Sequence, residues 1–429
     1  DYAVSVLLLL LIAASSTPSP PLQGLRQDLV HVKLASGVRG RPSVEGSEVR
    51  PLFSLRARTL GGDLDRWHRI EVAPGQGPRL VERLEQLDWV ERASLAPAAV
   101  DPPADLEPTT PDFSELQSYW GPAPGGVGLD EAALWPAGDG RHVAVADLEY
   151  DWEADHEDLG ALIGAEELGW DEQSWSFHGN AVLSMLFAGR DGYGVDGGVP
   201  AARPVLVHPY VADDDYDVAA MIAEAAAALE AGDVLLIEQQ AWAHDDYAPV
   251  EVHAAAYDAI RAAVDAGIVV IEPAGNGAQD LDDGDWGGWF DREQRDSGAI
   301  LVGGGQSPSQ DSPRAWAKGS CYGSRVDVQG WYVDIAAATT GSYSPDLFYP
   351  DGDDRQAYTS AFGGTSGASP MVAAVAAAFQ SIHIELTGAP MEPLALRALM
   401  VSTGTPQQGE ELIGPQPDLR QMLRLGLLP

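Results

Sequence analysis

The chain has 429 residues, a formal net charge of −40 at pH 7 and one cysteine. This length allows one large domain and a smaller one. Hydrophobic residues make up 45% of the chain and charged residues 21%, which indicates a globular protein. The negative charge argues against nucleic acid as a partner, because phosphate binding needs a basic surface. A single cysteine excludes an intrachain disulfide.

The first hundred residues differ from the rest. Residues 1–100 hold 12 Lys or Arg and 11 Asp or Glu, whereas residues 101–429 hold 13 and 54, so the sequence indicates two units. At the N-terminus, Ala3 to Ala14 is apolar and a Pro-rich stretch follows through Pro21. This pattern predicts a partial secretory signal over residues 1–20, and hence secretion. A membrane anchor is the less favoured alternative, because twelve residues are short for a span.

Residues 25–96 have the pattern of a small α+β unit. Alternating apolar residues predict strands at 29–34, 67–72 and 89–95, with an amphipathic helix at 77–87 between the last two. Residues 97–111 are rich in Pro, Ala and acidic residues, which is typical of an exposed linker.

From residue 112 onward, short apolar strands alternate with helices. Strands are expected at 143–146, 205–207, 234–237, 268–271, 299–302 and 326–328, and helices at 180–187, 218–230 and 252–265. Such alternation predicts a parallel sheet covered by helices on both faces. The active site of such a sheet lies at the carboxyl ends of the strands.

One stretch combines glycines, a serine and a following apolar helix. Ser366 lies within Gly363 to Pro370, just before the Ala- and Val-rich run that begins at Met371. A serine at a helix N-terminus lies among free N–H groups that stabilise negative charge, which suits a nucleophile. A helix cap is the alternative, since caps are commoner than nucleophiles.

A nucleophilic serine needs a base and an orienting acid. Asp147 directly follows an expected strand, and His178 opens an expected helix. The chain order Asp147, His178, Ser366 is one of the known orders for such triads. The elbow pattern G-x-S-x-G of other serine hydrolases is absent, since Ala368 occupies its last position.

These motifs resemble those of the subtilisin-like serine peptidases of the subtilase family (peptidase S8). Over residues 112–405, the family patterns G-T-S-x-A-x-P, H-G-T and A-G-N correspond to Gly364 to Pro370, His178-Gly179-Asn180 and Ala274-Gly275-Asn276. The acid motif departs from the usual D-[ST]-G and reads Asp147-Leu148-Glu149, so Glu149 is a second candidate to face His178.

The resemblance implies an α/β, three-layer subtilisin-like fold with a mostly parallel sheet over residues 112–429. It implies a serine endopeptidase with the triad Asp147, His178 and Ser366, and Asn276 as an oxyanion donor. Its partners would be protein or peptide substrates, with no cofactor for the chemistry and a monomeric state. Residues 25–96 would be a ferredoxin-like propeptide that inhibits the enzyme until the precursor cuts itself.

The expected substrate cleft also departs from the family. Glu238-Gln239-Gln240 replaces a Ser-Leu-Gly strand and, with Ala274 and Gly275, is expected to bind substrate. Glu238 and Glu272 either favour basic substrate side chains or point into solvent.

Two other functions and one metal remain open. The altered acid motif and the Glu238-Gln239-Gln240 strand are compatible with a catalytically dead subtilase fold that only binds. The second alternative is an acid-active sedolisin-type peptidase, with a Glu or Asp base and an Asp oxyanion donor. His178 and Asn276 argue against the sedolisin type. Structural calcium would be held by acidic loops, and the candidates are residues 213–215, 280–285 and 351–354.

Overall fold

The computed structural model describes residues 25–38, 44, 47–97 and 109–427. The chain divides into two compact units, Asp1–Glu107 and Pro108–Pro429. The predicted secretory signal lies outside the described residues, as does most of the predicted linker.

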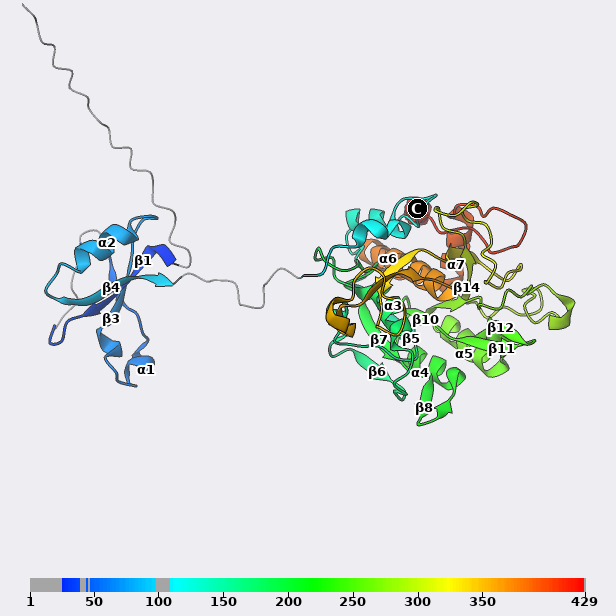
Figure 1. Cartoon of the computed structure of the whole chain (residues 1–429), viewed down its shortest axis with the longest axis horizontal. Helices are drawn as coiled ribbons and strands as arrows, with labels where there is room; N and C mark the ends of the chain where they lie inside the picture. Colours follow the sequence, from blue (N-terminus) through cyan, green and yellow to red (C-terminus); the bar gives the residue numbers. More distant parts are fainter. Residues whose placement is uncertain (1–24, 39–43, 45–46, 98–108, 428–429) are drawn as a thin grey trace, which may run out of the picture. The chain divides into compact units, whose positions relative to one another are not determined.

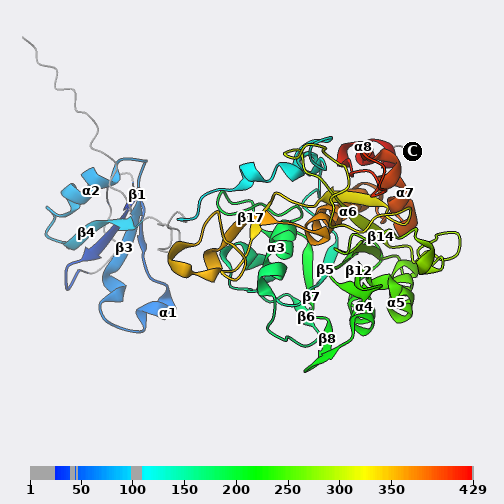
Figure 2. The ribbon, with the colours of Figure 1, turned by 45° about the vertical axis from the view of Figure 1, so that its right-hand side comes forward.

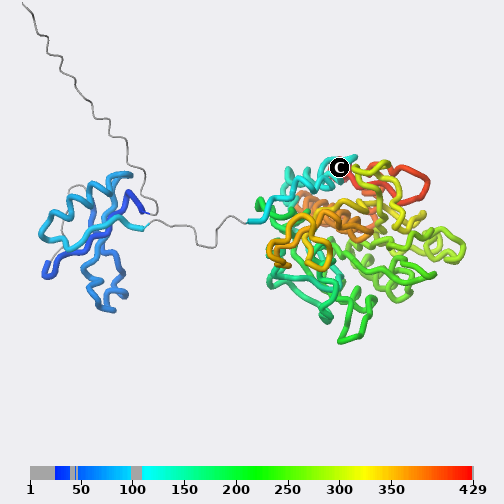
Figure 3. Tube along the Cα trace, in the orientation of Figure 1, coloured from blue at the N-terminus to red at the C-terminus, as the bar shows by residue number. Residues whose placement is uncertain are grey.

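The first unit is a four-stranded antiparallel sheet with a helix on it (Figures 1 and 3). Its elements are β1 (Leu25–Leu34), β2 (Val49–Pro51), α1 (Leu55–Arg58), β3 (Trp67–Glu71), α2 (Gly77–Leu84) and β4 (Val90–Pro97). Leu80 and Leu84 of α2 pack on Val30, Val32 and Ile70 of the sheet. The order β2-β3-β1-β4 is that of a ferredoxin-like sheet, but α1 is a single turn after β2.

The second unit is built on a seven-stranded sheet in which all adjacent strands are parallel. In spatial order its strands are β15 (Val328–Trp331), β14 (Ile300–Gly305), β13 (Val269–Pro273), β10 (Val234–Ile237), β5 (Ala144–Leu148), β7 (Arg203–Val207) and β6 (Glu166–Leu168). The predicted strand 234–237 is confirmed with the same bounds, and the α/β fold class is confirmed.

Helices cover both faces of this sheet, as Figure 2 shows. One face of the sheet packs on α3 (Ser176–Phe187) and α6 (Thr365–Thr387). The opposite face of the sheet packs on α4 (Val218–Ala227) and α5 (Ala254–Asp265). The chain ends with α7 (Pro393–Thr403) and α8 (Leu419–Gly426). Short antiparallel pairs flank the sheet: β8 (Tyr210–Ala212) with β9 (Asp215–Tyr216), β11 (Gln240–Ala243) with β12 (Asp246–Pro249), and β16 (Ile335–Ala338) with β17 (Tyr358–Phe362).

Among the described helices, α6 alone is long and apolar enough to cross a membrane. However, 89% of its most apolar window is buried inside the molecule. It is therefore the core helix of this unit, and its N-terminus carries Ser366.

Candidate active site

The central strands bring three carboxyl groups to one face of the sheet. Side chains alternate along a strand, so Val145, Asp147 and Glu149 share the face that packs on α3 and α6. On the adjacent strand, Leu236 also faces this way, which places Glu238 on the same side. The Glu238 N–H donates to the carbonyl of Leu148 at 3.1 Å, continuing the parallel pairing beyond β10.

Glu149 is the carboxylate that binds His178. The Oε2 atom of Glu149 lies 2.5 Å from Nδ1 of His178, which is the third residue of α3. Gly179 makes this approach possible: a Cβ there would lie 2.9 Å from the Glu149 Cγ and 2.1 Å from the Asp151 carbonyl oxygen. Burial lowers the pKa of His178, but the charge and hydrogen bond of Glu149 outweigh it and raise the pKa above 6.5.

Asp147 does not take the place predicted for it. It lies within β5 rather than after it, its side chain is 1% exposed, and neither oxygen has a hydrogen-bond partner among the described residues. Burial and the neighbouring Glu149 raise its pKa well above the usual range, so Asp147 is held neutral. In the structure Glu149 contacts His178 in place of Asp147, because the strand runs two residues further than predicted and presents Glu149 at its end.

Ser366 is the second residue of α6, among the N–H groups that have no partner within the helix. The preceding Gly364 has φ of 81°, a conformation that favours glycine, and a Cβ there would lie 3.1 Å from the Asn276 side-chain oxygen. The Thr365 N–H donates to that oxygen at 2.9 Å. This hydrogen bond connects the turn before Ser366 to the loop that carries Asn276.

Asn276 is held by a residue that sequence reasoning assigned only to the substrate cleft. The Gln240 side-chain oxygen accepts hydrogen bonds from the Asn276 backbone N–H at 2.9 Å and from its Nδ2 at 3.3 Å. An amide nitrogen carries two hydrogens, so one remains to face a substrate oxygen. Gln240 therefore fixes the orientation of the amide predicted to stabilise the oxyanion.

These groups line one cavity of about 380 Å³. His178, Ser366 and Asn276 lie on its wall together with Glu238, Gln239 and Gln240. The described residues show no hydrogen bond between His178 and Ser366, as is common before substrate binds. Aromatic side chains that sequence reasoning missed complete the wall: Tyr150, Trp175, Tyr210 and Tyr247.

The other substrate-cleft expectations need correction. Ala274 is buried in an apolar cluster and Gly275 packs on the Ala248 backbone, so neither lines the cavity. Neither Glu238 nor Glu272 points into solvent: they are 5% and 0% exposed. Glu272 does not line the cavity, and its side-chain oxygen accepts the Glu251 N–H at 2.9 Å.

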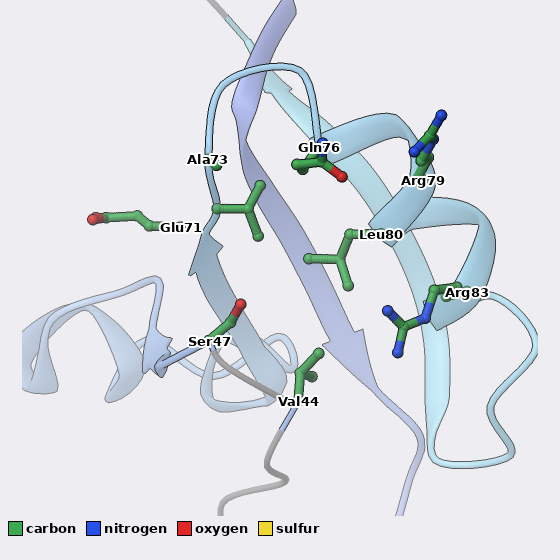
Figure 4. Close-up of a pocket in the computed structure, with 9 residues that line it drawn as sticks. Val44, Ser47, Glu71, Ala73, Gln76, Arg79, Leu80 and Arg83 are labelled. Carbon is green, nitrogen blue, oxygen red and sulfur yellow. The ribbon is translucent and has the colours of Figure 1, made fainter.

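A larger hollow of about 720 Å³ lies on the first unit (Figure 4). Arg79 and Arg83 of α2 and Glu71 line it, without a histidine that could activate its one serine, Ser47. Within the described ranges, no group of three or more His, Cys, Asp or Glu side chains is arranged to hold a metal ion. Structural calcium in the acidic loops therefore stays a prediction.

A serine in the first turn of a helix, a carboxylate-bound histidine and a neighbouring amide define a serine hydrolase suited to acyl transfer. The model of the subtilase family matches residues 138–416, and the chain belongs to this family of serine-type peptidases.

No curated protein matches the chain. Similar solved structures include the prenylagaramide maturation protease PagA, with 18% identity, 69% of this chain and 96% of that chain covered and a TM-score of 0.47. Another is the self-cleaved protease domain of PatA, which is 18% identical to this chain. The match covers 66% of this chain and 96% of that chain, with a TM-score of 0.48.

Proposed function

We propose that this chain is a secreted serine endopeptidase, made as a precursor, in which Ser366, His178 and Glu149 act as the catalytic triad. The observation that carries this proposal is the 2.5 Å contact between Glu149 and His178 beside a cavity that Ser366 also lines. The bond to Nδ1 leaves Nε2 as the ring nitrogen available to the serine.

The chemistry follows from these positions. Ser366 Oγ attacks the peptide carbonyl carbon while its proton passes to Nε2 of His178, and Glu149 stabilises the resulting imidazolium. The negative oxygen of the tetrahedral intermediate accepts hydrogen bonds from the Ser366 N–H and the Asn276 amide. The C–N bond then breaks as His178 returns the proton to the leaving amine. Water repeats the sequence on the acyl-enzyme, and no cofactor is needed.

The pH dependence is the first test. His178 must be neutral to accept a proton, and its pKa is raised by Glu149. We therefore expect kcat/KM for a peptide substrate to fall as the pH decreases through a midpoint above 6.5. A profile with its optimum near about pH 4 would instead favour the sedolisin-type alternative, in which a carboxylate is the base.

Processing of the precursor tests the role of residues 25–96. A tethered inhibitor acts at a high effective concentration and loses that advantage once its linker is cut. We expect wild-type protein to lose this unit by cleavage between Ser94 and Glu115, and Ser366→Ala to keep it. N-terminal sequencing of both purified proteins measures this. An active wild-type enzyme that retains residues 25–96 would show that the unit is not a propeptide.

A further inference from the structure

We propose that Glu238 is a further catalytic residue, whose protonated carboxyl group donates a hydrogen bond to the Ser366 hydroxyl oxygen and leaves the hydroxyl hydrogen for His178. This inference rests on the proposed function and adds a group that a Ser-His-acid triad does not contain.

The first support is the position of Glu238. It follows β10 at the carboxyl end of the sheet, on the face that packs on α6, and its side chain lines the same cavity as Ser366 and His178. The Ser366 hydroxyl group is close enough to lower the pKa of Glu238, against the larger effect of burial. Glu238 and the serine that would attack the substrate therefore line the same cavity.

The second support is the burial of this carboxyl group. Glu238 is 5% exposed, and neither of its buried carboxyl oxygens has a hydrogen-bond partner among the described residues. An unpaired buried charge is costly, whereas a neutral carboxyl group beside a hydroxyl group can be satisfied by a small rotation. Burial therefore favours a neutral carboxyl group in the cavity that Ser366 also lines.

The third support is the local charge. Three carboxyl groups, those of Asp147, Glu149 and Glu238, influence one another, and Glu149 alone is paired with the His178 ring. Burial and the negative charge of Glu149 raise the pKa of Glu238 well above its usual range, and Ser366 opposes this only in part. The raised pKa therefore favours the protonated form of Glu238.

The protonation state decides what Glu238 does to the serine. A neutral carboxyl group has one O–H donor, and a serine hydroxyl can accept that bond while donating its own hydrogen to His178. Once ionised, Glu238 accepts the serine hydrogen itself and competes with His178. Its negative charge then also lies beside the position where the oxyanion forms, which destabilises the transition state. Activity should therefore fall on the alkaline side as Glu238 loses its proton.

The test is the pH profile of kcat/KM for wild type, Glu238→Gln and Glu238→Asp, with Glu272→Gln as the matched control. Glu272 is a second buried carboxyl group whose pKa is raised, but it lies outside the cavity. We expect wild type and Glu272→Gln to lose activity at both acidic and alkaline pH. Glu238→Gln should lose the alkaline decline and, because an amide is the weaker donor, show about a fivefold lower maximum. Glu238→Asp should keep the decline at a shifted pH.

Two outcomes would overturn the inference. One is an alkaline decline in Glu238→Gln at the same pH as in wild type. The other is a folded but inactive Glu238→Gln that Glu238→Asp rescues, which would make ionised Glu238 a base. If Glu238→Gln fails to fold, loss of the alkaline decline in Glu238→Asp also contradicts the inference.

A wild type that neither hydrolyses peptides nor reacts with a fluorophosphonate refutes the proposed function and this inference together. An active wild type with an unaltered Glu238→Gln profile refutes the inference alone.

Discussion

Ser366→Ala is expected to lower kcat for peptide hydrolysis by about 10⁶-fold, the size of effect measured for the catalytic serine of subtilisin, another subtilase. The alanine removes the only atom that can form the acyl-enzyme, so what remains is the contribution of the oxyanion donors and of binding. His178→Ala should cost about as much, and the double variant little more, because the residues act as a unit. Steady-state kinetics on a fluorogenic peptide measures these losses.

Ser369→Ala is the matched control for this variant. Ser369 lies one turn further along α6, is buried, and donates to the Thr365 carbonyl oxygen at 2.8 Å. Its loss should leave kcat unchanged and cost about 1 kcal/mol of stability. Near wild-type hydrolysis by Ser366→Ala would show that Ser366 is not the nucleophile and would favour a binding protein.

Glu149→Gln is expected to lower kcat by about 10⁴-fold, whereas Asp147→Asn should change it less than about tenfold. The amide of a glutamine can donate to Nδ1 of His178, which favours the tautomer with hydrogen on Nε2. That tautomer cannot accept the serine proton. Asparagine, by contrast, closely replaces the neutral Asp147 carboxyl group.

The pair is informative because both residues lie on the same face of one strand and its extension. Parallel measurements of kcat and of the melting temperature separate a catalytic effect from a folding defect. A large loss in Asp147→Asn together with a small loss in Glu149→Gln would restore Asp147 as the orienting acid.

The sequence was sufficient to predict the parallel sheet, because buried strands such as 234–237 are short runs of apolar residues between helices. The positions of Ser366 and His178 at helix N-termini were also predictable, since each lies in a compact motif. Which carboxyl group contacts His178 stayed open between Asp147 and Glu149, because it depends on where β5 ends. The alternation of side chains was the available signal, since it places Asp147 and Glu149 on one face.

Other parts of the site depend on contacts between distant segments. The aromatic wall joins Tyr150, Trp175, Tyr210 and Tyr247 from separate loops and strands, and no spacing in the sequence brings them together. The hydrogen bonds that Asn276 donates to Gln240 likewise join residues 36 positions apart. The burial of Glu238 depends on how α6 packs over the strand ends, so the sequence left its direction open.

Labelling with a fluorophosphonate, followed by mass mapping of the modified peptide, tests the central claim most directly. A fluorophosphonate reacts only with a serine that a base activates, and it reports this without a known substrate. The triad proposed here predicts a label on Ser366, with a rate that falls strongly in His178→Ala and Glu149→Gln and little in Asp147→Asn. A label on another serine, no label at any pH, or an unchanged rate in Glu149→Gln would contradict it.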